Sequence, residues 1–369
     1  MASVDQVELR GKPESAPFPE PGIVRIWISR ATANAAISAH QHVQRITNGV
    51  PLEVDHPKDR KNKLTEDIDS DAVPAMRVIL ERAPFQSDCK DSEGGKEASP
   101  EKLGKPMPTL IGTFGNGIEK LSFVNDPVEN TTAATHGRAN AVSIIGLTDY
   151  NNITEIPLVE DGDKAHYFAK LFAPSSLNGV VSLEMSTAEN LHAAMKELQI
   201  PASRIRVAVM DRKANLSIIE SIQKVGAEYV PIKSGDLMWC LEAISSDLKN
   251  PERPILMMGR GGAEEGSIAA IGAHARGAVG QLRVVPREDE EADLDIVKRG
   301  QLWNAEEFIT GQSEHSMVIF SAITKNLHFD IPSVYEDPQH PGLYVVTSAI
   351  FDSQGVKFRT DSLRFQKAA

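Results

Sequence analysis

Between Ser186 and Ala275, segments with a helical pattern alternate with short apolar segments typical of strands. Ser186 and Glu189 form a capping-box pattern that opens the first helix. Strand-like runs follow at 205–211, 227–232 and 254–259, and helix-like runs at 216–225, 236–244 and 264–275. Such alternation is typical of a sheet whose strands are joined by helices, so it predicts an α/β fold.

The remaining chain is less regular. Its turn residues and apolar patterns predict a strand followed by a helix in 22–43, a loop at 48–63, a helix at 71–82, a loop at 86–108, and strands at 121–126 and 141–147. Three more strand-like segments, expected to form the closing meander of a sheet, are 316–323, 343–352 and 355–365.

The length of 369 residues favours two tightly joined domains, because single domains usually contain about 100–200 residues. We expect a loose N-terminal arm at 1–21, a first domain at 22–180 and a second domain at 181–369. The polar, Pro-rich start does not read as a secretory signal, and no apolar run is long enough to span a membrane.

Charge and cysteine content narrow the class of function. A net charge of −12 argues against nonspecific nucleic-acid binding, because phosphates would be repelled. Cys89 and Cys240 lie far apart in different contexts, so they predict neither a disulfide framework nor a CxxC metal site. We therefore expect a cytoplasmic protein that acts on a small molecule.

The segment Asp126-Pro127-Val128-Glu129-Asn130-Thr131 follows a predicted strand. Two carboxylates three residues apart, separated by a rigid proline, can converge on one hard cation, and Thr131 can orient a water molecule. The alternative interpretation is an ordinary Asp-Pro turn at the end of a strand.

A second segment, Gly259-Arg260-Gly261-Gly262-Ala263-Glu264-Glu265-Gly266, connects a predicted strand to a helix. Its backbone N–H groups can face an anion, as in a dinucleotide-binding turn. Glu264, however, stands where that fingerprint requires glycine or alanine, and an acid there would oppose a pyrophosphate. Glu264 and Glu265 can instead stabilise the start of the helix, or Glu265 can bind a metal.

Several segments resemble class II fructose-1,6-bisphosphatases over roughly residues 65–330. DPVENT resembles the family's DP-[IV]-E-G-T, HYFAKLFAP its Tyr-Met-x-Lys-Leu segment, GRGGAEEG its G-I-G-G-A-P-E-G loop and SMVIFSAITKN its V-I-F-S-A-T-G-I-T segment. The stretch from 189 to 236 resembles a helix-strand-helix-strand unit that ends in D-G-D. The five motifs follow the family's order, which makes the resemblance more specific than any one of them.

The resemblance implies a layered α/β/α/β/α fold of two sheets and a metal-dependent phosphoric monoester hydrolase. Alignment at 75–77 puts Asp69 on the last acid of D-K-N-T-A-D and, without a gap, Glu93 on the first acid of G-E-G-E. The implied ligands of Mg²⁺ or Mn²⁺ are Asp69, Glu93, Asp126, Glu129 and Glu265. The implied catalytic residues are Thr131, Asp69 and Glu129, and the implied substrate contacts are Tyr167, Lys170, Arg212, Asp236, Gly261 and Gly262. A homo-dimer or homo-tetramer is also implied.

Four departures accompany this resemblance. Asn130 replaces the glycine of D-P-x-E-G-T, Gly95 replaces the second acid of G-E-G-E, Ala214 replaces the second cation of a D-R-P-R-H-like string, and Ser234 replaces the first acid of D-G-D. The acids at the reacting end are thus better preserved than the groups that recognise the sugar. A sugar phosphatase with an altered substrate is the favoured hypothesis, followed by a catalytically silent sugar-phosphate-binding protein and, third, a nicotinamide oxidoreductase.

Overall fold

The computed structural model describes residues 16–47, 57–92, 110, 112–154, 167–246, 252–285 and 300–366. Its longer helices are α1 (Pro21–Thr47), α2 (Pro57–Leu80), α5 (Thr187–Leu198), α6 (Leu216–Val225), α7 (Leu237–Ile244) and α9 (Ala263–Arg276). Two short helices are α4 (Thr131–Thr135) and α11 (Ala305–Phe308).

The first sheet combines strands from both halves of the chain. Its strands are β1 (Gln86–Ser92), β2 (Gly112–Phe114), β3 (Lys120–Glu129), β4 (Val142–Asp149), β11 (Met317–Ala322), β12 (Tyr335–Glu336), β13 (Leu343–Asp352) and β14 (Gly355–Arg364). Their order is β12-β13-β11-β4-β3-β1-β2, with β14 paired to β13. The C-terminal strands therefore extend the sheet of the N-terminal half, because β11 pairs antiparallel with β4.

The second sheet has the order β10-β9-β5-β8-β6-β7. Its strands are β5 (Tyr167–Ala173), β6 (Arg206–Met210), β7 (Glu228–Ile232), β8 (Ile255–Gly262), β9 (Val279–Val285) and β10 (Leu302–Asn304). Sheet membership thus does not follow the expected division at residue 180, because β5 belongs to the second sheet and β11–β14 belong to the first.

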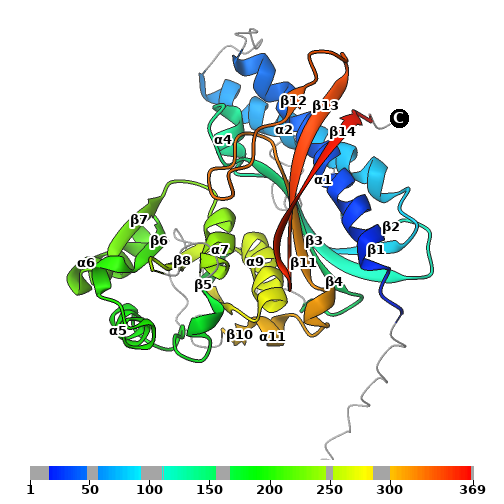
Figure 1. Cartoon of the computed structure of the whole chain (residues 1–369). Coiled ribbons are helices and arrows are strands. Elements are labelled where there is room, and N and C mark those ends of the chain that lie inside the picture. The colour runs from blue at the N-terminus through cyan, green and yellow to red at the C-terminus, as the bar shows by residue number, and fades with distance from the viewer. Residues whose placement is uncertain are drawn as a thin grey trace, which may run out of the picture.

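Both sheets are buried on two faces, which makes five layers. On β11, Val318 and Phe320 face the core between the sheets, whereas Met317 and Ile319 face the core under α1 and α2. On the second sheet, alternate side chains face either the central core or a third core under α5 and α6. Helices α7 and α9 lie between the sheets (Figure 1). The predicted α/β/α/β/α layering is confirmed.

Helix α9 is the centre of this arrangement. Nearly all of its side chains are buried, and many are alanine or glycine. It contacts β3, β4 and β11 of the first sheet as well as β5, β8 and β9 of the second. A helix buried on all sides must be apolar and narrow, and small residues let both sheets approach it closely.

The N-terminal expectations need three corrections. Residues 21–47 form one continuous helix without a strand, because Val24, Ile28, Ala31 and Ala35 recur with helical spacing and are buried. The expected loop at 48–63 contains the start of α2 at Pro57. The expected loop at 86–108 begins with β1, a polar strand that alternates between buried and partly buried residues and pairs parallel with β3.

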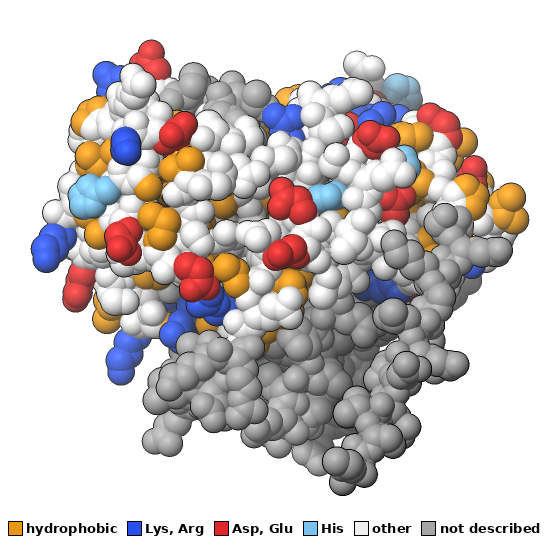
Figure 2. Space-filling view, turned by 90° about the horizontal axis from the view of Figure 1, so that it is seen from below, with side chains coloured by type: hydrophobic (Ala, Val, Ile, Leu, Met, Phe, Trp, Pro, Cys, Tyr) orange, Lys and Arg blue, Asp and Glu red, His pale blue; other side chains and the backbone are white. Residues whose placement is uncertain are grey.

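Side chains of mixed type lie on the face shown in Figure 2, where acidic and basic ones are interspersed with apolar ones. Among the described residues, no helix combines the length and the apolar character that crossing a membrane requires.

Candidate active site

The ends of four strands meet at one edge of the second sheet. Strands β6, β7 and β8 are parallel, so their carboxyl ends lie at the same edge. Strand β5 runs antiparallel to β8, so its first residue, Tyr167, pairs with Gly262 at the end of β8. Arg212 follows β6 and Asp236 follows β7. Ligands of α/β proteins commonly bind outside such carboxyl ends.

The DPVENT segment lies at the end of β3. Asp126 and Glu129 are both about 2% exposed, and the pairing register with β4 shifts between them. Val128 N donates a hydrogen bond of 2.9 Å to Asp126 Oδ1, which fixes this carboxylate. Thr131 opens α4, and its Oγ1 donates to the Val128 carbonyl at 2.9 Å. Because that bond uses the hydroxyl proton, the oxygen can still accept a hydrogen bond from a water molecule.

Lys170 and Asp236 form a buried ion pair. Lys170 Nζ donates to Asp236 Oδ1 at 3.1 Å and to Oδ2 at 2.9 Å, and the two side chains are 0% and 3% exposed. Burial alone would lower the pKa of Lys170, but the charges of Asp236 and Glu265 outweigh it and raise that pKa. The lysine therefore stays protonated at neutral pH.

The glycines at the end of β8 allow these side chains to lie against the backbone. A Cβ on Gly261 would lie 1.9 Å from Asp236 Oδ2 and 2.8 Å from Lys170 Nζ. A Cβ on Gly262 would lie 1.9 Å from Glu265 Oε2. Any other residue at either position would displace a charged group, so the GRGG sequence is needed for the packing of Lys170, Asp236 and Glu265.

Two turns, one that follows a strand of each sheet, touch directly at this site. Asn130 has φ 62° and ψ 50°, a left-handed conformation that asparagine tolerates better than most residues. Gly235 has φ +65°, and a Cβ there would lie 2.7 Å from Asn130 Cγ. Asn130 Nδ2 also donates to the Asn140 carbonyl at 3.4 Å. The turn after β3 is thus packed against the turn before α7.

Electrostatics also connect acids from different elements. Burial raises the pKa of the Cys240 thiol on α7, and the negative charges of Asp236, Glu129 and Glu265 raise it further. Burial raises the pKa of Asp236, although the charge of Lys170 and, to a smaller extent, that of Arg212 oppose this. Acids from the end of β3, from the start of α7 and from the start of α9 therefore act on the same buried region.

Of the two other predicted ligands, the structure describes only Asp69. Asp69 is partly buried in the middle of α2, whereas Glu93 lies outside the described residues. Gly95 also lies outside them. In the part of the chain that is described, no group of three His, Cys, Asp or Glu side chains is close enough together to hold a metal ion. The five-acid ligand set therefore stays a prediction.

Asn215 is a positioning residue that the sequence analysis overlooked. It is fully buried, its Oδ1 accepts a hydrogen bond from Arg260 N at 2.9 Å, and its Nδ2 donates to the Met210 carbonyl at 3.0 Å. These bonds tie the end of β6 to the GRGG segment of β8. In the sequence, the available signal was only an asparagine directly before a predicted helix; that it is buried and does not cap this helix is visible only in the structure.

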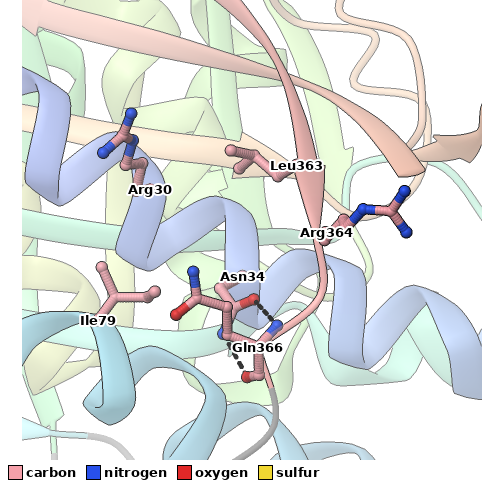
Figure 3. A pocket seen from close by; sticks show the side chains of 6 residues that line it. All are labelled: Arg30, Asn34, Ile79, Leu363, Arg364 and Gln366. Atoms are coloured by element: carbon pink, nitrogen blue, oxygen red, sulfur yellow. Dashed lines mark hydrogen bonds between the residues drawn. The ribbon is translucent and has the colours of Figure 1, made fainter. Parts of the chain in front are cut away.

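Two cavities lie on the opposite side of the first sheet, along α1. One of about 250 Å³ is lined by Arg30, Asn34, Ile79, Leu363, Arg364 and Gln366 (Figure 3). Figure 3 shows Asn34 bonded to Gln366, while the Arg30 and Arg364 side chains point away from each other. Another of about 350 Å³ adjoins His42 and Asp71. Neither is lined by a predicted site residue.

Comparison with known proteins gives one consistent result. Residues 27–326 match the family model described as bacterial fructose-1,6-bisphosphatase, glpX-encoded. A fructose-1,6-bisphosphatase class 2 from Haemophilus influenzae is 27% identical over 236 residues, which cover 63% of this chain and 65% of the relative. The aligned region is thus just under two thirds of that protein.

Cyanobacterial relatives match over longer regions. A protein of Prochlorococcus marinus named D-fructose 1,6-bisphosphatase class 2/sedoheptulose 1,7-bisphosphatase is 26% identical over 288 residues, covering 72% of this chain and 79% of the relative. A protein of the same name from Synechococcus is 26% identical over 278 residues, which cover 69% of this chain and 76% of the relative. Because the family model spans most of the chain and includes every predicted site residue, the chain belongs to the family of glpX-encoded bacterial fructose-1,6-bisphosphatases.

Proposed function

We propose that the protein hydrolyses a sugar phosphate with the help of Mg²⁺ or Mn²⁺ and releases inorganic phosphate. The substrate class is fructose 1,6-bisphosphate, sedoheptulose 1,7-bisphosphate or a related modified sugar phosphate. The observation that carries the proposal is the meeting of two buried carboxylates at the end of β3 with the charged strand ends of the second sheet. Family membership supports the same reaction. The reducing cytoplasm is the compartment that we propose, since both cysteines are free.

The donor atoms fit a hard divalent cation. Glu265 Oε2 is buried and has no hydrogen-bond donor, a situation that a cation would relieve. Carboxylate oxygens are also the ligands that Mg²⁺ and Mn²⁺ prefer. We propose Asp126, Glu129 and Glu265 as ligands, together with Asp69 and Glu93. When bound, such ions lower the pKa of a water molecule and neutralise charge on the leaving oxygen.

The chain's own residues would orient the reactants. Thr131, whose hydroxyl proton is held by the Val128 carbonyl, would accept a hydrogen bond from the attacking water molecule. Arg212 is partly exposed and carries the positive charge that a distal phosphate requires, and Tyr167 would contact the sugar. Lys170 and Asp236 are closed against each other, so they would reach substrate only after their pair separates.

The competing functions make different demands on this site. A nicotinamide cofactor would need its pyrophosphate beside the GRGG turn, where Glu265 lies against Gly262 and would repel it. A silent sugar-phosphate-binding protein would need only the recognition groups and no metal-activated water molecule. Phosphate release therefore distinguishes the proposed function from both alternatives.

The test is a panel of sugar mono- and bisphosphates assayed for phosphate release with added Mg²⁺ or Mn²⁺. We expect turnover of at least one sugar phosphate and its loss when the metal is chelated. Saturable binding of a sugar phosphate without any phosphate release would support the binding-protein alternative and contradict the proposed function.

A further inference from the structure

Strand β14 is a long open edge of the first sheet. It pairs with β13 along its whole length, in one regular register from Leu343↔Arg364 to Asp352↔Gly355. No strand of the described chain pairs with its other side. Ten residues of regular β-strand therefore present one row of N–H and C=O groups outward, which is a template for pairing with another strand.

The other sheet edges in the described chain are short or interrupted. Strands β2 and β10 have three residues each, and β12 has two. Strand β7 has five residues, one of which is Pro231. Short strands and proline are the usual means of protecting an edge from pairing. Strand β14 has neither proline nor a bulge, and it carries Phe358, which is 56% exposed.

The hairpin determines which groups of β14 point outward. A two-residue turn, Ser353-Gln354, joins the pair Asp352↔Gly355, and such a turn is closed by a hydrogen-bonded pair. Along the ladder the odd-numbered residues of β14 then bond to β13. The even-numbered ones, including Phe358, Thr360 and Ser362, direct their backbone groups to the open edge.

The charges on β14 select one arrangement of two copies. Arg359 and Asp361 bond to each other at 2.6 and 2.7 Å within the chain. If two β14 strands pair antiparallel about a two-fold axis at Thr360, Arg359 of each copy lies opposite Asp361 of the other. An axis at Arg359 or at Asp361 would instead oppose like charges, and an axis at Phe358 would oppose Arg359 and Lys357. Cross-strand opposite charges stabilise, and like charges destabilise.

We propose that β14 is a self-association surface, on which a second copy of this chain pairs antiparallel about Thr360 and joins the two first sheets into one continuous sheet. In this register Phe358 of each copy lies beside Ser362 of the other, which covers the exposed rings. None of the predicted site residues lies on β14. The proposal therefore does not depend on the chemistry of the candidate active site.

Cysteine cross-linking tests the register. In Thr360→Cys the two sulfur-bearing residues face each other with Cα atoms about 5.5 Å apart, within the range that a disulfide accepts. Ser362→Cys is the matched control, because the same register separates its two Cα atoms by about 14 Å. Cys89 and Cys240 are buried and do not compete. On treatment with diamide, the full-length Thr360→Cys protein should form a disulfide-linked dimer and Ser362→Cys should not.

Charge reversal tests the interface in the protein without added cysteines. Arg359→Asp places acids opposite Asp361 of the partner copy, so the dimer dissociation constant should rise roughly tenfold or more. Adding Asp361→Arg restores opposite charges and should restore association. Light scattering after size-exclusion chromatography, over a dilution series, measures the dimer dissociation constant of the single and of the double variant. A monomeric wild-type protein at all concentrations, cross-linking of Ser362→Cys instead, or a dimer insensitive to Arg359→Asp would each overturn the proposal.

Discussion

At the scale of single residues, the Lys170–Asp236 pair is the most buried charged contact of the site. Removing one partner leaves the other charge buried without compensation, which costs about 3–5 kcal/mol. We expect Lys170→Met to lower the free energy of unfolding by this amount, measured by urea titration at pH 7.5. The double variant Lys170→Met/Asp236→Asn should lose less, because neither member of the pair then leaves its partner's charge uncompensated. Equal losses in the two variants would show that the packing of the lysine, and not the pair, provides the stability.

The residues of this site differ in how far the sequence predicts them. Motif order assigns Asp126 and Glu129 to a strand end and Glu265 to the start of a helix, because such motifs lie in fixed positions of the family. The same motifs cannot show that Lys170 and Asp236 are paired with each other, since this depends on two turns meeting in space. The role of Gly261 is hidden for the same reason, because only the packed structure shows which side chains lie against it.

At the scale of elements, the contact between Asn130 and Gly235 joins the turn after β3 to the turn before α7. Gly235→Ala should cost about 1–2 kcal/mol for the left-handed backbone, and more because its Cβ would meet the Asn130 side chain. In an Asn130→Gly background the clash with the side chain disappears and only the backbone cost remains. We therefore expect a coupling energy of at least about 0.5 kcal/mol between the two substitutions. Urea unfolding of the wild type, the two single variants and the double variant measures this coupling energy.

Gly226→Ala is the control for backbone strain alone. Gly226 has φ +87°, and no atom lies within 4 Å of a Cβ built there. Its substitution should be destabilising in both backgrounds by the same amount. If Gly235→Ala behaves in the same additive way, the two turns are not packed as described.

Helix α9 is held to the first sheet by a hydrogen-bonded chain at its last turn. His274 Nδ1 lies 2.9 Å from Ser316 Oγ, which lies 2.8 Å from Thr148 Oγ1. Burial lowers the pKa of His274, although the charges of Glu306 and Asp149 oppose this. The unfolded chain, with a histidine pKa of about 6.5, then binds the proton first as pH falls. This contribution to stability is present above about pH 6.5 and is lost as pH falls through the pKa of the folded state.

We therefore expect the wild-type protein to lose more stability between pH 7 and pH 5 than His274→Gln does. His40 also has a pKa lowered by burial, but it is present in both proteins and cancels in the difference. Thermal unfolding at a series of pH values gives the comparison. Parallel pH profiles would mean that His274 is not held neutral in the folded state.

Regular elements were easier to predict than polar or long ones. The alternating segments from 186 to 275 match the structure because each apolar run is short and bounded by caps or glycines. Strand β1 was missed because its sequence, QSDCKDS, contains no branched apolar residue and is held by its neighbours β2 and β3. The start of α1 was predicted as a strand because IVRIWI satisfies both periods over a short window.

At the scale of the whole molecule, the two sheets and the helices between them bring acids from distant segments to one region. Helix α9 carries Glu265 at its start and packs on β3, the strand that ends in Glu129. The sequence predicts the five layers only through the family resemblance. Local patterns do not show that β11–β14 return to the first sheet, since strand order is set by packing over long separations.

The central claim, that Asp126 and Glu265 belong to a metal-dependent phosphatase site, is tested most directly by matched substitutions of acids. The measurement is phosphate release from fructose 1,6-bisphosphate with Mn²⁺ for wild type, Glu265→Gln, Asp126→Asn and Glu264→Gln. Glu264 is the control, because it is a buried acid of the same helical turn at a position where the family motif has proline. We predict that the first two substitutions reduce turnover at least about a hundredfold with the fold intact, whereas Glu264→Gln stays within about threefold. Undiminished phosphate release by Glu265→Gln or Asp126→Asn would contradict the account.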